Sequence, residues 1–144
     1  MDIENNNVID VKVNAWSTKR TLLLIACIDF IFNLLASLFT ESPVYFIVSL
    51  VILLGIYGLQ QYKYCLSTFY GVYLIFQVLV RFILLFYIDT STLFIIFTYC
   101  IIVFDIWIFW LLKKFLGYLK VLSDEELDDL RNGWAPNVFT VIYY

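Results

Sequence analysis

The chain has 144 residues, of which 63% are hydrophobic and 20% aromatic, so it is more apolar than a typical soluble domain. The net charge is only −3, histidine is absent, and the cysteines at positions 27, 65 and 100 show neither a disulfide framework nor a zinc spacing. These features argue against a basic nucleic-acid-binding surface and against histidine-based catalysis. They predict no enzyme activity, no metal and no cofactor.

The first 20 residues are polar, and the apolar sequence begins only after Arg20. A polar stretch of this kind buries too little apolar surface to fix its conformation. Residues 1–20 are therefore predicted to be a mostly disordered cytosolic segment, or partly a short surface segment from Val8 to Trp16. The late start of the apolar run also argues against a secretory signal.

Four apolar runs follow, and as helices that rise about 1.5 Å per residue they are about 27 to 33 Å long, close to the thickness of about 30 Å of a hydrocarbon core. The predicted spans are 21–39, 44–61, 66–87 and 92–112. Short turns separate them, so consecutive spans should pack antiparallel. The sequence therefore predicts an all-α integral membrane protein, with a four-transmembrane-helix bundle over residues 21–112.

Small side chains mark the faces on which neighbouring spans are predicted to pack. In the first span, small and polar residues recur every three or four positions, which keeps them on one helical face. They are Ala26, Asp29, Asn33, Ala36 and Thr40. Small residues also end the second span and begin the third, which predicts a close approach near Lys63. They are Gly55, Gly58, Ser67 and Gly71.

The distribution of basic residues predicts the orientation. Lysine and arginine precede the first span, occur between the second and third spans, and follow the fourth. They are Lys12, Lys19, Arg20, Lys63, Lys113, Lys114 and Lys120. The other two turns contain the acids Glu41 and Asp89 and no basic residue. The positive-inside rule then predicts that both termini lie in the cytosol. The membrane itself is expected to be an endomembrane (Golgi, endosome or lysosome) or the plasma membrane.

Five polar side chains interrupt the spans and form the candidate functional cluster. They are Asp29, Asn33, Gln77, Arg81 and Asp105. Counting along the helices puts Arg81 and Asn33 about 9 Å from the outer boundary, and Gln77 and Asp29 about 15 Å from it. Asp105 lies deeper, at about 20 Å. Arg81 is therefore predicted to pair with Asp29, which leaves Asp105 unpaired and titratable.

Three interpretations of this cluster stay open. The charges can fix the packing of the helices, bind a charged partner, or line an ion or proton path. Four helices enclose little interior volume, so a path would require a homo-oligomer. The predicted function is a non-enzymatic scaffold, trafficking adaptor or accessory subunit of a membrane complex. The alternative is a small oligomeric ion- or proton-coupled transporter or channel. The expected partners are the lipid bilayer and other membrane proteins, and no nucleic acid.

Residues 113–144 are predicted to form a cytosolic helix and tail. One interpretation of the part up to Leu122 is an amphipathic helix that rests on lipid. The side chains on its apolar face are Phe115, Leu116, Leu119 and Leu122. The same stretch contains Tyr118-Leu119-Lys120-Val121, which fits the Tyr-x-x-apolar pattern of endocytic and lysosomal sorting, with Tyr118 and Val121 as anchors.

A second, shorter helix is predicted after Leu122. Ser123 followed by Glu126 forms a capping-box pattern, which marks the start of a helix. Gly133 is predicted to end this helix, and Pro136 to prevent its resumption.

Short-looped spans with cytosolic ends, a polar first helix and Gly55-Ile56-Tyr57-Gly58 closing the second span resemble small tetraspan proteins. The groups most similar in these respects are the lysosome-associated four-span proteins and the MARVEL-type vesicle proteins. The resemblance implies an endomembrane protein that organises or traffics partners. The lysosomal group carries Pro-Pro-x-Tyr motifs in its tail, whereas this chain has Ala135-Pro136-Asn137.

Overall fold

The computed structural model describes residues 2–40, 43–87 and 92–136. Within these ranges the chain forms five helices and no strand, which confirms the all-α prediction. The helices are α1 (Asp2–Thr40), α2 (Pro43–Gln60), α3 (Tyr64–Tyr87), α4 (Thr92–Val121) and α5 (Asp124–Arg131). The predicted outer turns, with Glu41 and Asp89, lie outside the described residues, as does the end of the tail from position 137 onward.

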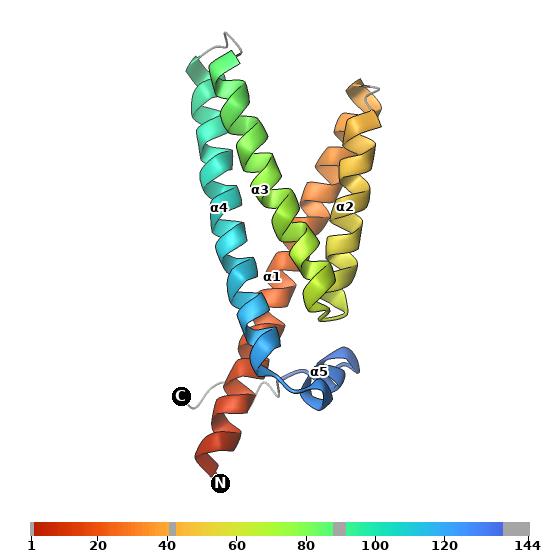
Figure 1. Ribbon diagram of the computed structural model, residues 1–144, viewed down its shortest axis with the longest axis vertical. Helices are drawn as coiled ribbons and strands as arrows, with labels where there is room; N and C mark the ends of the chain where they lie inside the picture. The colour runs from red at the N-terminus through yellow and green to blue at the C-terminus, as the bar shows by residue number, and fades with distance from the viewer. Residues whose placement is uncertain (1, 41–42, 88–91, 137–144) are drawn as a thin grey trace.

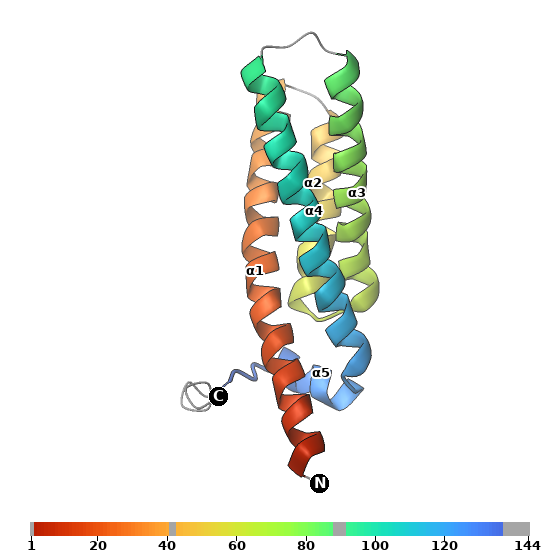
Figure 2. The ribbon, with the colours of Figure 1, turned by 90° about the vertical axis from the view of Figure 1, so that its left-hand side faces the viewer.

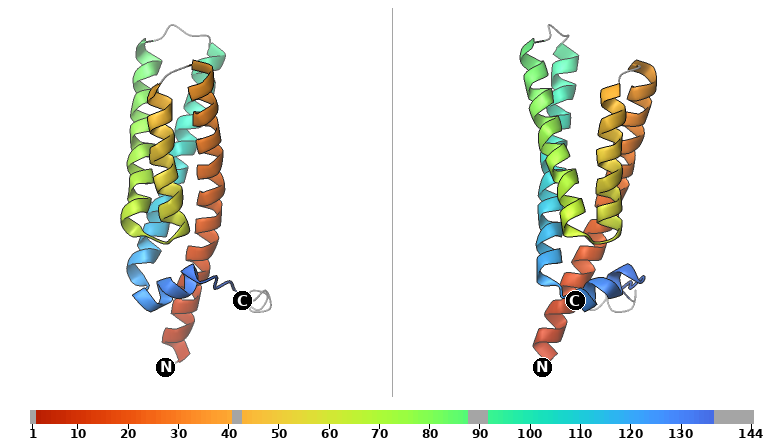
Figure 3. Two further views of the ribbon diagram at one scale, coloured as in Figure 1. Left: turned by 90° about the vertical axis from the view of Figure 1, so that its right-hand side faces the viewer. Right: turned by 45° about the vertical axis from the view of Figure 1, so that its right-hand side comes forward.

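The four long helices form two antiparallel pairs, α1 with α2 and α3 with α4. The pairs meet near α5 and diverge toward the opposite end (Figure 1). In the view turned by 90°, the same helices lie side by side, and α5 lies across the end at which they converge (Figure 2). Both further views show the α2–α3 turn at this converged end (Figure 3). The densest core is there, where Tyr62, Leu59, Leu22 and Phe115 are at most 1% exposed.

The prediction that residues 1–20 are mostly disordered is wrong, because α1 begins at Asp2 and continues without a break through the first apolar run. Its inward face repeats every three or four residues, which is the spacing of one helical face. The described members of this stripe, all buried or half-buried, are Lys12, Ala15, Lys19, Leu22, Ala26, Asp29 and Asn33. From Lys12 onward the polar part of α1 packs against the rest of the chain through this face. Tertiary packing of one face supplies most of a helix's stability.

The turn between α2 and α3 closes with a Schellman motif. The Lys63 N–H donates to the Gly58 carbonyl at 2.9 Å, and the Tyr62 N–H donates to the Leu59 carbonyl at 3.3 Å. Tyr62 occupies the left-handed position with φ of +50°, which costs a non-glycine residue about 1–2 kcal/mol. Its ring is buried against Phe115, with ring centroids 6.0 Å apart, so core packing offsets this cost.

Glycines let α2 and α3 approach closely at this turn, as the sequence predicts. A Cβ on Gly58 would lie 2.5 Å from the Ser67 backbone nitrogen, and a Cβ on Gly55 would lie 2.6 Å from the Tyr70 Cβ. Both distances are shorter than real contacts allow, so both positions require glycine. Gly71 instead faces α4, where a Cβ would lie 3.0 Å from Leu112.

The prediction that residues 115–122 rest on lipid is wrong. They continue α4 to Val121, and Phe115, Leu119 and Leu122 are each at most 7% exposed inside the core cluster. The core there also includes Leu127 and Leu130 from α5. The apolar face of this stretch therefore packs against protein.

The capping box of α5 is confirmed. The Ser123 hydroxyl accepts from the Glu126 N–H at 3.4 Å, and the Glu126 carboxylate accepts from the Ser123 N–H at 2.7 Å. After α5 ends at Arg131, Gly133 adopts φ of +96°, and the Trp134 N–H donates to the Asp129 carbonyl at 3.0 Å. Gly133 thus ends the helix in the manner that its sequence position predicts.

Polar contacts tie α5 to the bundle. Lys12 Nζ lies 2.9 Å from the Asp129 carboxylate, and Arg131 Nε donates to the Gln61 carbonyl at 2.8 Å.

A further contact joins α1 to the α2–α3 turn, where Lys19 Nζ lies 4.1 Å from the centre of the Tyr62 ring. Burial lowers the pKa of Lys19 and raises the pKa of Tyr62 to about 12, so the Tyr62 phenol is neutral at physiological pH. Lys19 and Arg131 also donate to the Gln60 and Gln61 carbonyls, and positive charge is favourable at the C-terminal end of a helix such as α2.

Candidate functional site

A polar cluster occupies the space between α1, α3 and α4. It contains the five residues predicted from the sequence and two tyrosines of α3. Its members are Asp29, Asn33, Tyr70, Tyr73, Gln77, Arg81 and Asp105. The surrounding side chains on these helices are mainly apolar, so the cluster must satisfy its own hydrogen-bonding groups.

Arg81 forms an ion pair and hydrogen bond with Asp105, between Nη1 and a carboxylate oxygen. The side chain of Asp105 is 7% exposed and that of Arg81 is 25% exposed. The predicted pairing of Arg81 with Asp29 is therefore wrong, and Asp105 is not unpaired.

The direction in which helical side chains lean explains this pairing. Cα–Cβ bonds tilt toward the N-terminus of their own helix. Because α3 and α4 are antiparallel, Arg81 leans toward the converged end and Asp105 leans away from it. The two side chains thus lean toward each other. A count of residues along the helices ignores this lean and therefore overestimates the difference in depth between their charged groups.

Asp29 is held by α3. The Tyr70 hydroxyl donates to Asp29 Oδ2 at 3.4 Å. Arg81 attracts Asp29 electrostatically in addition to its bond with Asp105. Among the described residues of the cluster, the Arg81 guanidinium therefore pairs with the Asp105 carboxylate and also attracts the Asp29 carboxylate.

Tyr73 links the two pairs that the sequence places opposite one another. Its hydroxyl accepts from Asn33 Nδ2 at 3.2 Å and from Gln77 Nε2 at 2.8 Å. Asn33 Nδ2 also donates to the Asp29 carbonyl at 2.8 Å. Asp29 and Asn33 thus face Gln77 through Tyr73, while Arg81 turns mainly to α4.

Tyr70 and Tyr73 were not predicted as members of the cluster, although the sequence contains a signal for them. Both precede Gln77 and Arg81 at helical spacing, so all four residues share one face of α3. Tyrosine appears throughout this chain, and its abundance concealed the two residues whose hydroxyl groups point inward.

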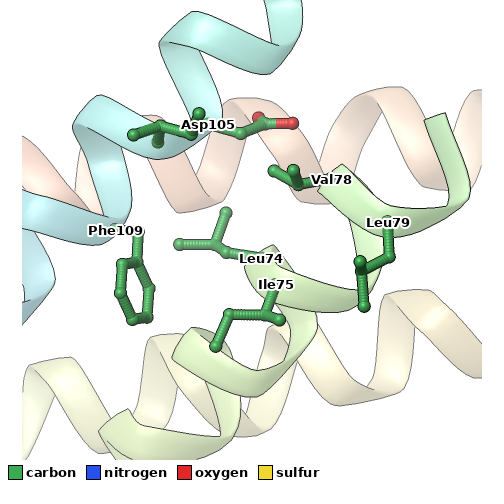
Figure 4. A pocket seen from close by; sticks show the side chains of 7 residues that line it. Leu74, Ile75, Val78, Leu79, Asp105 and Phe109 are labelled. Atoms are coloured by element: carbon green, nitrogen blue, oxygen red, sulfur yellow. The ribbon is translucent and has the colours of Figure 1, made fainter. Parts of the chain in front are cut away.

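A cavity of about 140 Å³ lies beside the ion pair, between α3 and α4. Asp105 lies on its wall, and the rest of the lining is apolar (Figure 4). Ile75, Leu79, Ile106 and Phe109 are exposed at this place, so the cavity opens outward. With a single polar side chain in its lining, it offers little to orient a polar ligand.

The Tyr-x-x-apolar motif lies in the last turns of α4. Tyr118 is half-buried and Val121 is 73% exposed. Sorting adaptors read such motifs as extended peptides, whereas these four residues are helical. The motif is therefore not presented for that mode of recognition in this conformation.

Large apolar side chains cover the outside of α1 to α4. We call this surface the apolar band; it comprises the exposed large apolar side chains within residues 24–38, 46–57, 69–83 and 96–110. Phe32, Leu38 and Val103 are each at least 66% exposed within it. Because the helices alternate in direction, the four ranges lie beside one another along the bundle (Figure 2). So many exposed large apolar side chains on a protein usually mark a surface that contacts another protein or lipid.

One described segment is long and apolar enough to cross a membrane by length and composition alone. It is Tyr64–Ile83 in α3, with a mean hydropathy of 1.6, and only 28% of its most apolar stretch is buried. A core helix of a soluble protein would be mostly buried. The apolar part of α2, Phe46–Gln60, is shorter. Of the four predicted spans, the described structure therefore supports one by length and hydropathy.

Comparison with known proteins gives no match to any family model, curated protein or solved structure. Interpretation of the polar cluster and of the apolar band therefore rests on their geometry.

Proposed function

We propose that this chain is a four-span integral membrane protein with both termini in the cytosol, and that it acts as a non-enzymatic scaffold, trafficking adaptor or accessory subunit. The observation that carries the proposal is the inside-out distribution of side chains. The apolar band faces outward on all four long helices, while the polar cluster lies between them. Such an arrangement suits a lipid solvent, in which polar groups must find partners inside the protein.

The charges support the proposed orientation. Of the nine lysine and arginine residues, Arg81 alone lies within the apolar band, and the other eight lie at or beyond the converged end. Both described ends of the chain lie there too (Figure 1). Basic residues concentrate on the cytosolic side of membrane proteins, so this end is assigned to the cytosol.

The cysteines provide a direct test of the topology. Cys27, Cys65 and Cys100 are all exposed, so a maleimide would reach all three if the bundle stood in water. Cys27 and Cys100 lie within the apolar band, whereas Cys65 is the second residue of α3. In membranes, single-cysteine variants should label at least about tenfold faster at Cys65, because only thiolate in contact with water reacts.

The labelling assay carries its own controls. Denaturation in SDS should make the three single-cysteine variants equally reactive. In cells, an impermeant maleimide should reach Cys65 only after the plasma membrane is permeabilised. Equal labelling of the three cysteines in intact membranes would overturn the proposed topology.

The scaffold role is supported by the internal bonding of the polar cluster. Asp29 with Tyr70 and Asn33 with Tyr73 connect α1 with α3, and the ion pair between α3 and α4 connects those two helices. These bonds fix the relative positions of the helices and leave the outer faces for other membrane proteins. One observation favours the transporter alternative, namely that the described cluster contains two aspartate side chains and one guanidinium.

Affinity purification separates the two functions. A tag at the N-terminus, where α1 extends away from the bundle, allows isolation in mild detergent followed by mass spectrometry and native mass measurement (Figure 1). A stable set of co-purifying membrane proteins, absent from an equally tagged unrelated four-span protein, is the expected result. A homo-oligomer with nothing else bound would contradict the scaffold role and favour the transporter, to be followed by flux assays of Asp29→Asn in proteoliposomes.

A further inference from the structure

Exposed basic side chains surround the converged end at the edge of the apolar band. We call them the basic collar, which comprises Arg20, Lys63, Lys113, Lys114 and Lys120. They come from α1, the α2–α3 turn and α4, so segments distant in the sequence contribute to one girdle. The collar is thus a product of the fold as well as of local sequence.

Aromatic rings hold four of the five collar cations. Lys114 Nζ lies 3.7 Å from the Trp110 ring centre, and Lys63 Nζ lies 5.5 Å from the Tyr57 ring centre. The other two contacts are Arg20 over Trp16 at 4.7 Å and Lys120 over Tyr64 at 5.1 Å. Cation–π contacts of this length are attractive. Trp110 and Tyr57 belong to the apolar band, so the charges lie immediately beyond its edge.

The collar charges are not neutralised within the described part of the protein. The ion pairs found there are Lys12 with Asp129, Arg81 with Asp105, and Arg131 with Asp128. None of them includes a collar residue.

The nearby acids lie on a separate element. The exposed residues Asp124, Glu125, Asp128 and Asp129 belong to α5, whose buried leucines face the bundle. Figure 2 shows α5 across the end of the bundle, beyond the α2–α3 turn. Along the bundle axis, the surface therefore changes from apolar to basic and then to acidic.

We propose that the basic collar binds anionic phospholipid headgroups of the cytosolic leaflet. This inference rests on the proposed membrane topology. Each lysine ammonium has three N–H donors, so one that contacts a ring on one side can still donate to a phosphate or carboxylate oxygen. The ring beside it suits the interface between headgroups and acyl chains. One basic residue near an anionic surface raises affinity by about fivefold, and the collar presents several in one girdle.

Tryptophan quenching tests the proposal on the full chain in vesicles of phosphatidylcholine and phosphatidylserine. One lipid at a time carries brominated acyl chains, which quench tryptophan on contact. The chain has four tryptophans, so the measurement uses a variant with phenylalanine at positions 16, 107 and 134. The remaining Trp110 lies beside Lys114 and reports the lipids that gather at the collar. If phosphatidylserine gathers at the collar, its brominated form should quench as strongly as it would at about five times its share of the vesicle lipid.

Two matched variants isolate the collar. A variant that combines Arg20→Gln with glutamine at positions 63, 113, 114 and 120 should reduce the enrichment to random mixing, whereas arginine at the four lysine positions should preserve it. A control, Asp124→Asn with Glu125→Gln, changes the net charge outside the collar and should leave the enrichment unchanged. If the glutamine variant fails to fold, raising the ionic strength with the unmodified protein must reduce the enrichment instead.

The outcomes for the two proposals are distinguishable. Strong quenching by brominated phosphatidylcholine with no preference for phosphatidylserine would overturn lipid selectivity and leave the membrane topology intact. No quenching by either brominated lipid would overturn the membrane topology itself, and the lipid proposal with it.

Discussion

Arg81→Leu should lower the free energy of unfolding by about 3 kcal/mol, because it leaves Asp105 buried without its partner. Asp105 is 5% exposed, and the attraction of Arg81 for Asp29 is lost as well. Reversible unfolding in detergent micelles, followed by far-ultraviolet circular dichroism during titration with SDS, measures the change.

A double-mutant cycle provides the control for this effect. Arg81→Leu combined with Asp105→Leu should be more stable than Arg81→Leu alone, because replacing both partners of a buried ion pair with apolar residues is often close to neutral. Adding Asp29→Asn to Arg81→Leu should also recover part of the loss, because it removes the other uncompensated carboxylate. Stability of Arg81→Leu within about 0.5 kcal/mol of the original protein would contradict a structural role for this pair.

Gly58→Ala should destabilise the bundle by about 3 kcal/mol, at the upper end of the range for overpacking. The added Cβ would lie 2.5 Å from the Ser67 nitrogen and 2.6 Å from the Leu66 carbonyl carbon, and neither backbone atom can rotate away. The α2–α3 turn must therefore open, which disturbs Tyr62 and the core around it. The same unfolding titration in micelles measures the loss.

Gly117→Ala is the matched control for Gly58→Ala. Gly117 lies in α4 with nothing within 4 Å of an added Cβ, so alanine meets no clash there. Because alanine is the better helix former, this change should be neutral or stabilise by up to about 1 kcal/mol. Equal effects of the two substitutions would show that α2 and α3 do not approach as closely as described.

Much of the fold could be predicted because local sequence patterns specify it. The apolar runs predict α2 and α3 to within about two residues at each end, which is the usual uncertainty of helix boundaries. Ser123 with Glu126, and Gly133 after α5, act through hydrogen bonds or backbone conformation within a few residues. Such signals can be read without knowledge of the rest of the chain.

The candidate site could be predicted only in part. The spacing of Asp29 and Asn33, and of Gln77 and Arg81, identifies inward faces of two helices. The choice of partner was wrong, because it depends on helix tilt and on the lean of long side chains across a helix pair. The tyrosines were missed because a tyrosine is compatible with an apolar surface until the fold turns its hydroxyl group inward.

The sequence by itself determined that the chain is helical, that its charges lie mainly at one end, and that α2 and α3 meet through glycines. Each of these properties follows from composition, helical periodicity or short-range geometry. Only the tertiary structure decided that the polar start of α1 is helical, that the end of α4 is buried, and that Arg81 pairs with Asp105. In each of these cases the stabilising partner lies on another helix, so the energy that selects the conformation appears only after the helices pack.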